Sequence, residues 1–410
     1  MIRWIIFIAI FLIIDFYAFQ AVRTAFKSRG VNLLYILASF IVLGNFIYQL
    51  QTSDKGSGIN TKINLAIGLF ITLYIPKIVI MIMMFGEDIF RLPQACYKYF
   101  TEGNAAEGNY LPSRRQFISQ IALGLATIPF ASFLYGMVKG KYNFKVLKYV
   151  LHFEDLPDAF DGYTITQISD IHSGSFDNKE KVEYAVDLVN EQSSNVILFT
   201  GDMVNNKAEE MIPWKDTFRR LKAEDGVFSV LGNHDYGDYV RWDSDEEKGR
   251  NLEDLKNIQK ELGFDLLLNE SRFLEKDNQR IALIGVENWG KGFKQKGDLQ
   301  KASSAIEKTD FKILMSHDPS HWEAQVIDDD YHYHLTLSGH THGMQFGIEI
   351  PGWIKWSPVK WRYKYWAGIY KEKGQYINVN RGLGYLAFPG RVGIWPEITV
   401  IELKKGSNSA

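Results

Sequence analysis

Acidic, amide and imidazole side chains recur in five short motifs from residue 170 onward. In chain order the motifs are Asp170-Ile171-His172, Gly201-Asp202, Gly232-Asn233-His234-Asp235, Ser316-His317 and Gly339-His340-Thr341-His342. They hold five of the nine histidines. Oxygen and imidazole donors together suit hard or borderline divalent cations, not soft thiolate chemistry. One Asp-x-His motif alone would indicate only ordinary loop residues, but five motifs in this order predict a metal site.

Each motif closely follows a short run of β-branched or apolar residues. The runs cover residues 164–168, 196–199, 227–231, 313–315 and 335–337. Such runs are typical of buried strands, and open α/β sheets bind ligands at the carboxyl ends of their strands. We therefore expect the five loops to gather at one sheet edge. Helical apolar spacing over residues 178–191 and 252–262 predicts helices that cover the sheets.

From about residue 150 to 404 the chain resembles the calcineurin-like metallophosphoesterases, because the five motifs match that family's pattern in full. The resemblance implies an α/β fold, a four-layer α-β-β-α sandwich over residues 148–405 with two facing mixed sheets and helices outside. It also implies two divalent metal ions, of manganese, iron or zinc. One ion would be bound by Asp170, His172 and His342, the other by Asn233, His317 and His340, and Asp202 would bridge them with one oxygen to each.

The resemblance further implies a role for the two remaining motif residues. His234 is expected to face the substrate phosphate and not to bind metal, and Asp235 is expected to orient the His234 imidazole. Two such cations activate a bridging water, so hydroxide would attack a phosphate mono-, di- or pyrophosphate ester in line without a covalent intermediate. The chain's ending resembles a membrane-linked branch of the family, except that Met344 stands where relatives commonly have glycine.

The first third of the chain predicts a membrane anchor over residues 1–140. Four apolar runs cover residues 4–22, 31–50, 63–85 and 117–137. Each approaches the roughly 20 residues that a helix needs to cross a bilayer core of about 30 Å. One such run could be a buried core helix, but four in succession with polar connectors favour three to four membrane-spanning helices.

The charges of the connectors predict the orientation of this anchor. The first connector is basic (Arg23, Lys27, Arg29), the second less so (Lys55 and Lys62 beside Asp54), and the third again basic (Arg91, Lys98, Arg114, Arg115). The positive-inside rule then places the catalytic part outside the cytoplasm. Residues 113–118, Ser-Arg-Arg-Gln-Phe-Ile, resemble a twin-arginine export signal and favour the same side. Lysines 139, 141, 145 and 148 favour the alternative, the cytoplasmic face.

Two charges lie within the apolar runs, Asp15 in the first and Lys77 in the third. Isolated charges in a membrane are unfavourable and are usually paired. In the expected orientation the two residues lie at similar depths, so we predict an ion pair between them. The alternative is that Lys77, beside Pro76, extends alone toward the cytoplasmic face.

Several residues outside the motifs are candidates for substrate contact. Residues 352–370 interleave four tryptophans with lysine and arginine, a composition typical of a lipid headgroup surface. Trp353 is therefore a candidate for lipid or substrate contact, although the segment could simply pack on its own domain. Arg381 and Arg391 could clamp a second phosphate, or form structural ion pairs. The charged residues 238–250 predict an exposed loop, either a lid or a solvated insertion.

Composition limits the remaining possibilities. The single cysteine, Cys96, excludes a disulfide within one chain, and a net charge of −2 argues against a nucleic-acid partner. The sequence thus predicts a membrane-anchored metal-dependent phosphohydrolase, with a lipid- or nucleotide-linked ester as its substrate and membrane lipid as a partner. The alternative is a membrane sensor or transporter with a regulatory metal-binding domain.

Overall fold

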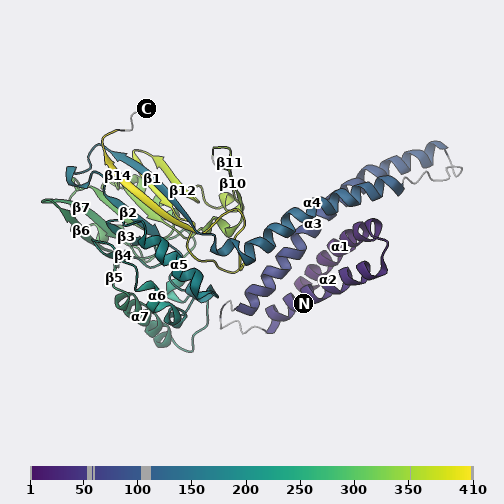
Figure 1. Cartoon of the computed structure of the whole chain (residues 1–410), viewed down its shortest axis with the longest axis horizontal. Helices are drawn as coiled ribbons and strands as arrows, with labels where there is room; N and C mark the ends of the chain where they lie inside the picture. Colours follow the sequence, from purple (N-terminus) through teal and green to yellow (C-terminus); the bar gives the residue numbers. More distant parts are fainter. Residues whose placement is uncertain (1, 53–57, 59–60, 103–111, 351, 408–410) are drawn as a thin grey trace. The chain divides into compact units, whose positions relative to one another are not determined.

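The chain forms two compact units, which are described separately. The computed structural model describes residues 2–52, 58, 61–102, 112–350 and 352–407. The first unit comprises residues 1–53 and 62–138, and the second comprises residues 54–61 and 139–410. The first is helical and the second contains the sheets (Figure 1).

Four long helices form the first unit. They are α1 (Ile2–Ala25), α2 (Arg29–Thr52), α3 (Thr61–Glu102) and α4 (Pro112–Val138). Each contains a stretch long and apolar enough to cross a membrane, and these stretches include all four expected runs. Helix α3 continues well past residue 85, so much of the expected third connector is helical. Residues 54 and 55 of the second connector, and residues 103–111 of the third, lie outside the described residues.

The predicted ion pair within this unit is confirmed. Lys77 Nζ lies 2.6 Å from Asp15 Oδ1, joining α3 to α1, and Lys77 is only 2% exposed. Lys77 also donates to Ser39 Oγ on α2 at 2.7 Å. The Tyr74 and Tyr35 hydroxyls donate to the Asp15 carboxylate at 2.7 and 3.2 Å. Lys77 therefore does not extend alone toward the cytoplasmic face. It pairs with Asp15, and residues of α2 and α3 donate hydrogen bonds to the Asp15 carboxylate.

The two arginines of the export-like segment have different surroundings. Arg115 lies 2.9 Å from Glu87 and 2.8 Å from Asp88 on α3, and it donates to Gln20 on α1 at 2.6 Å. Arg114 is exposed. Arg115 therefore ties α4 to two other helices, which is a structural role whether or not the segment also acts as an export signal.

The second unit contains two six-stranded mixed sheets. The first has the order β1-β14-β2-β3-β4-β5 and the second has the order β12-β13-β9-β8-β7-β6. The strands of the first sheet, in that order, are Lys145–Phe153, Glu397–Lys405, Thr164–Ile168, Val196–Phe199, Val227–Ser229 and Phe264–Leu266. Those of the second are Gly368–Glu372, Gln375–Val379, Leu335–Ser338, Lys312–Met315, Gln279–Gly285 and Glu270–Lys276. All five expected strands are present, with β4 ending two residues early. Strands β2 to β5 are parallel, as are β7, β8, β9 and β13.

Alternation along the strands produces the four layers. In β3, Val196 and Leu198 enter the core between the two sheets, whereas Ile197 and Phe199 point to the opposite face. Helices α5 (Lys179–Asn190) and α7 (Asp245–Glu261) cover that outer face of the first sheet. The short helices α8 (Leu299–Ala302) and α9 (Ser320–Ala324) pack on the outer face of the second. The expected α-β-β-α sandwich is therefore confirmed (Figure 1).

The expected loop over residues 238–250 is wrong in its second half, because α7 already begins at Asp245. The Ser244 side chain accepts a hydrogen bond from the Glu247 amide and caps the helix. Three acidic residues fill the first turn, where the helix dipole favours negative charge. The segment lacks apolar periodicity because its first turns are exposed, and this concealed the helix from the sequence pattern.

Candidate metal centre

Five strand ends bring the motif residues to one edge of the sandwich. Strands β2, β3, β4, β8 and β9 each run directly into a loop that carries them. Backbone strain concentrates at these positions. The left-handed region is occupied by Asp170, His172, Asp202, His340 and His342, with φ of 48, 47, 60, 70 and 49°. Side chains with a Cβ rarely adopt such angles, and they persist where the surrounding structure enforces them. The fold thus enforces a particular direction on each of these side chains.

Glycines in the motifs allow the loops to approach one another closely. A Cβ at Gly232 would collide with the Asp202 carboxylate, and a Cβ at Gly339 would collide with Ser169 and the Asp170 carboxylate. The glycines are therefore required by contact between loops from different strands, and a larger residue would displace an expected ligand.

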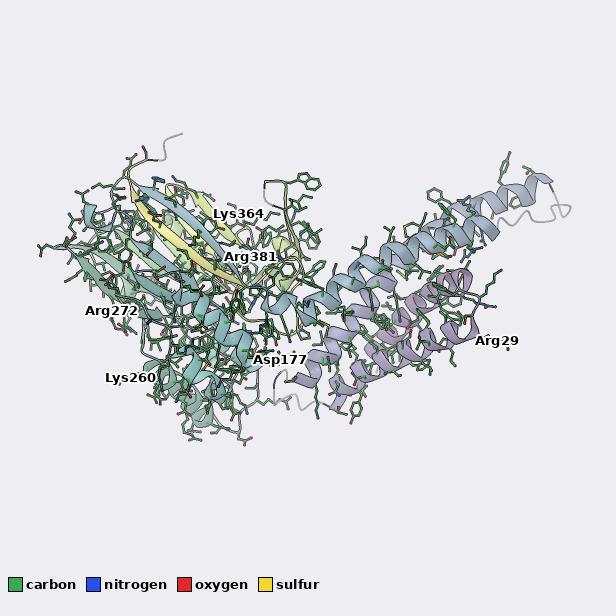
Figure 2. All side chains as sticks on the ribbon, viewed as in Figure 1. Arg29, Asp177, Lys260, Arg272, Lys364 and Arg381 are labelled. Atoms are coloured by element: carbon green, nitrogen blue, oxygen red, sulfur yellow. The ribbon has the colours of Figure 1, made fainter. Side chains whose placement is uncertain are left out.

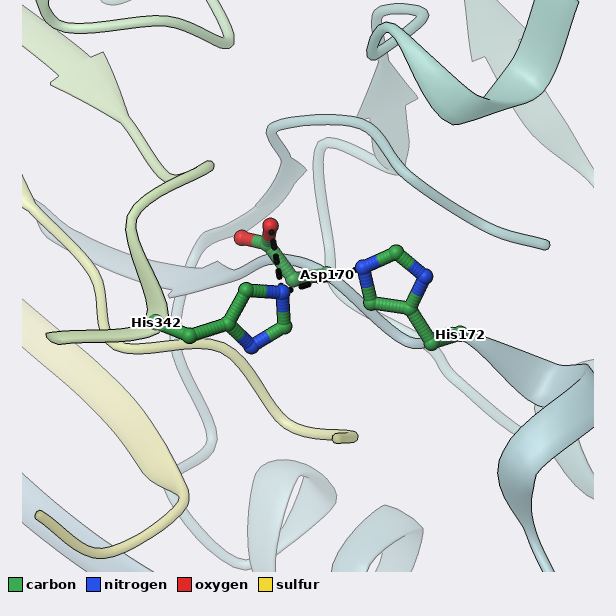
Figure 3. Close-up of side chains that lie close together, drawn as sticks. All are labelled: Asp170, His172 and His342. Atoms are coloured by element: carbon green, nitrogen blue, oxygen red, sulfur yellow. Dashed lines mark hydrogen bonds and ion pairs between the residues drawn. The ribbon is translucent and has the colours of Figure 1, made fainter. Parts of the chain in front are cut away.

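Asp170, His172 and His342 form the first group of expected ligands. One donor atom from each lies within 4.8 Å of the others (Figure 3). The His172 and His342 Nε2 atoms are 3.0 Å apart, and His342 Nε2 lies 3.3 Å from Asp170 Oδ1. Two imidazole nitrogens and a carboxylate oxygen that converge in a buried space can hold one divalent cation.

The second group contains Asp202, His317 and His340, again with donor atoms within 4.8 Å of one another. Asn233 joins it, because Asn233 Oδ1 lies 2.8 Å from His340 Nδ1. The Asn233 Nδ2 group donates to the Tyr239 hydroxyl at 2.7 Å, which fixes the amide with its oxygen toward the group. The structure thus brings together all the residues expected at the second metal.

Asp202 lies between the two groups. Its Oδ2 atom is 3.2 Å from His317 Nε2 and 3.5 Å from His172 Nε2, so it faces both. Its Oδ1 atom instead accepts the His234 backbone N–H at 2.8 Å. Its Oδ2 atom therefore faces both groups of expected ligands, and the expectation that each oxygen binds one ion stays a prediction.

The donors fit divalent cations. His317 Nδ1 lies 2.7 Å from the Thr200 carbonyl, so Nδ1 is the nitrogen that donates its N–H there. The other ring nitrogen, Nε2, is left as the atom that can bind a metal ion. His317 Nε2 is buried and lies 3.2 Å from Asp202 Oδ2, but it makes no hydrogen bond of good geometry among the described residues. A cation between it and Asp202 would satisfy both atoms. His340 Nε2 is held similarly, 2.8 Å from the Tyr363 hydroxyl and 3.4 Å from Asp318.

Electrostatics indicate the same need for a cation. Burial raises the pKa of Asp170 to about 7. Burial opposes the charged form of His317, yet Asp202 raises the His317 pKa to about 10. Burial lowers the pKa of His172 to about 3. In the apoprotein, Asp170 and His317 thus bind protons near neutral pH, and metal ions would replace these protons.

His234 lies beside the metal groups without joining either. Its ring centroid is 4.9 Å from that of His172 and 4.3 Å from that of Tyr239. Its Nδ1 atom is 2.7 Å from the Asn205 carbonyl, so Nδ1 carries a proton and Nε2 remains free. This placement is compatible with the expected action on a bound phosphate.

The expected role of Asp235, orienting the His234 imidazole, is wrong. Asp235 is fully buried, and its carboxylate accepts backbone N–H groups from Asp202 at 3.0 Å, Met203 at 2.8 Å and Gly232 at 2.8 Å. Its oxygens are therefore committed to the loop that carries Asp202. Asp235 therefore positions the loop that carries Asp202, and the Asn205 carbonyl orients His234.

The two arginines proposed to clamp a second phosphate are buried. Arg381, labelled in Figure 2, pairs with Glu397 and lies 2.6 Å from Glu349. Arg391 is fully buried and donates to the Gly384 carbonyl at 3.0 Å, while its Nη2 lies 3.2 Å from His342 Nδ1. The ion pairs of Arg381 favour the structural alternative for that residue. Arg391 keeps a buried Nη1 group without a hydrogen-bond partner among the described residues, so a phosphate clamp at Arg391 stays a prediction.

Trp353 is 77% exposed at the turn of a two-stranded hairpin. The hairpin consists of β10 (Ile348–Ile350) and β11 (Ile354–Trp356). Contact between Trp353 and substrate or lipid stays a prediction.

Four residues that the motif search did not identify surround the second metal group. Tyr239 bonds Asn233, Tyr363 bonds His340, and the Phe293 ring centroid lies 4.7 Å from that of His340. The Arg362 guanidinium lies over Phe293. Three of them lie in segments that the sequence analysis marked, Tyr239 in residues 238–250 and Arg362 and Tyr363 in residues 352–370. No pattern identified the individual residues, because contacts between separate loops leave no local pattern.

Comparisons with known proteins agree with this geometry. The family described as "Calcineurin-like phosphoesterase" matches residues 163–344, and "Probable Calcineurin-like phosphoesterase, transmembrane domain" matches residues 2–141. "Uncharacterized metallophosphoesterase YkuE" of Bacillus subtilis is 30% identical over 302 residues, covering 71% of this chain and 98% of that protein.

Two further relatives have similar coverage of this chain. "Phosphodiesterase YaeI" of Escherichia coli is 26% identical, covering 71% of this chain and 99% of that protein. "Transmembrane protein with metallophosphoesterase domain" of Danio rerio is 26% identical, covering 66% of this chain and 60% of that protein. With its sandwich fold and converging His and Asp side chains, the chain belongs to the calcineurin-like metallophosphoesterases, in a form with four N-terminal helices able to span a membrane.

Proposed function

We propose that this protein is a membrane-anchored phosphoesterase that uses two divalent metal ions to hydrolyse a lipid- or nucleotide-linked phosphate ester or diphosphate. The placement of Asp202 carries the proposal, because its Oδ2 atom faces a donor group on either side. A regulatory domain of a sensor or transporter would not need His234 beside two intact ligand groups. The name of the Escherichia coli relative, a phosphodiesterase, also supports ester hydrolysis.

The proposed chemistry divides between the metals and the protein. When bound, two divalent cations activate water and neutralise charge on the phosphoryl oxygens. Asp170, His172 and His342 would hold one cation, and Asn233, His317 and His340 would hold the other. In its imidazolium form His234 would donate the Nε2 proton to the leaving oxygen, while its Nδ1–H stays bonded to the Asn205 carbonyl. Asp235 keeps Asp202 in place through the backbone of its loop.

An exposed apolar surface supports a lipid-linked substrate. It consists of exposed side chains, namely Met344, Ile348, Ile350, Trp353 and Trp361. It follows directly on the loop that carries His340 and His342. Aromatic and aliphatic side chains with nearby cations are typical of surfaces that enter a lipid headgroup layer, and the chain's own anchor keeps this unit close to a bilayer.

The proposal is tested with the full-length protein in detergent, stripped of metal and reloaded with manganese, iron or zinc. We expect hydrolysis of bis(p-nitrophenyl) phosphate only after reloading, and a higher kcat/KM for a lipid-linked diphosphate presented in mixed micelles. His342→Ala serves as the matched control and should be inactive with every metal. Absence of hydrolysis of monoesters, diesters and diphosphates with all three metals would contradict the proposed function.

A further inference from the structure

Arg362 is an exposed cation beside the second metal group. It follows the short helix η9 (Pro358–Trp361). Among the described residues no carboxylate lies within ion-pair distance of its guanidinium. Arg362 differs in this respect from Arg381, Arg272 and Arg280, because each of those arginines forms an ion pair with an acidic side chain. A guanidinium left without a carboxylate is available to bind an anion from solution.

Two aromatic rings connect Arg362 to the metal ligand His340. The Arg362 Cζ atom lies 5.0 Å from the Phe293 ring centroid and 5.5 Å from that of Tyr363. Phe293 packs edge-on against the His340 ring at 4.7 Å between centroids, and the Tyr363 hydroxyl lies 2.8 Å from His340 Nε2. A guanidinium that stacks on aromatic faces keeps its N–H donors available in the plane of the group. The rings therefore hold Arg362 at a set separation from the metal ligand.

Tyr239 shows that the second metal group lies near the surface. The Tyr239 hydroxyl accepts a hydrogen bond from Asn233, and its ring packs on that of His234. Tyr239 is itself 44% exposed, so this part of the site reaches solvent. Arg362 is likewise exposed, and only Phe293 and Tyr363 separate it from His340 of the second metal group.

We propose that Arg362 binds a second anionic group of the substrate, next to the phosphate at the metal centre. This inference rests on the proposed function and narrows its substrate class to esters that carry a further negative charge, above all diphosphates. A guanidinium binds phosphate oxygens through two parallel N–H donors, which is stronger and more directional than contact with an ammonium group. Arg362 is then a specificity residue, since a phosphodiester without the second charge would not use it.

The test uses the metal-loaded full-length protein hydrolysing bis(p-nitrophenyl) phosphate, which carries no second anionic group. Uridine 5′-monophosphate and uridine 5′-diphosphate serve as competitive inhibitors, with free metal kept in excess. We expect Arg362→Ala to raise the Ki for the diphosphate about tenfold, the loss of one charge-assisted contact. The Ki for the monophosphate and the KM for the diester should change less than twofold. Arg362→Lys should give an intermediate Ki for the diphosphate.

Lys360→Ala is the matched control, because Lys360 is an exposed cation two residues away on η9. It should leave both Ki values unchanged. Equal increases for both inhibitors in Arg362→Ala, or an unchanged Ki for the diphosphate, would overturn the inference. Failure of the wild type to hydrolyse the diester would count against the proposed function instead, and calorimetric titration of the same variants with the two nucleotides would still decide the role of Arg362.

Discussion

At the scale of single residues, the proposed chemistry depends most on Asp202. Its Oδ2 atom faces both ligand groups, so Asp202→Asn removes the negative charge that two cations would share. We expect the purified variant to retain at most one metal ion per chain and almost no activity. His234→Ala should keep both ions and lose about 10²–10⁴-fold in kcat, the usual contribution of a positioned proton donor. Metal content is measured by mass spectrometry, and a His234→Ala protein with one ion or none would refute the assigned role.

The titrating ligands make metal affinity depend on pH. Asp202 raises the pKa of His317 to about 10 against the effect of burial, and burial raises that of Asp170 to about 7. The apoprotein therefore holds protons at neutral pH, and metal binding must release them. Affinity should rise between pH 6 and 8, by up to about tenfold per pH unit for each proton released. Calorimetry in buffers of different ionisation enthalpy measures the release, and affinity independent of pH would contradict this assignment.

At the scale of elements, the Asp15–Lys77 pair fixes the packing of helices α1 and α3. Asp15→Asn or Lys77→Met leaves the other charge buried with only neutral partners, Tyr35, Tyr74 and Ser39. We expect each single change to lower the Tm of the protein in detergent, and the double change to recover much of the loss. The coupling free energy should be about 1 kcal/mol or more, within the range for polar contacts between membrane helices. Strictly additive effects would exclude a functional pairing.

The hairpin of β10 and β11 is the second element whose role can be tested. Trp353 and Trp361 are 77% and 75% exposed, so serine at both positions should cost little stability. In proteoliposomes, the double variant should lose about tenfold or more in kcat/KM toward a lipid-borne ester, because a buried aromatic side chain contributes roughly 1.5–3 kcal/mol. Hydrolysis of bis(p-nitrophenyl) phosphate should hardly change. Equal losses on the two substrates would favour a simple packing role.

At the scale of the whole molecule, the connector charges predict a catalytic unit outside the cytoplasm. A reporter that is active only outside the cytoplasm, fused after Ala410, should therefore give signal, and a silent reporter would place the unit on the cytoplasmic face.

Lysine variants of the two arginines distinguish a role in export from a role in helix packing. Arg115→Lys should lower the thermal stability of the helical unit, since a single ammonium cannot replace three contacts with Glu87, Asp88 and Gln20. Arg114→Lys should change neither the thermal stability nor the reporter signal. If the export machinery instead recognises the arginine pair, both variants should lose the reporter signal to the same extent.

The sequence by itself determined the strands, the helical spans and the set of metal donors. A buried strand and a membrane helix are defined by apolar residues that are neighbours in sequence, so each element leaves a local pattern. Parallel strands from both sheets, not from one as expected, then bring their carboxyl ends to the same edge of the sandwich, which is why the expected ligands converge around Asp202. Even the Asp15–Lys77 pair followed from regular helix geometry, because depth in a helix is proportional to residue number.

Only the tertiary structure decided which partner each of the other polar side chains has. Asp235 binds the backbone of the Asp202 loop and not the adjacent His234, and Arg381 pairs with Glu349 and Glu397 from two other strands. Arg362 retains a guanidinium without a carboxylate partner in the described part of the chain. Hydrogen bonds and ion pairs act over only a few ångströms. Their partners are therefore chosen by strand order and loop contact between residues far apart in the chain, which no local pattern of residue types encodes.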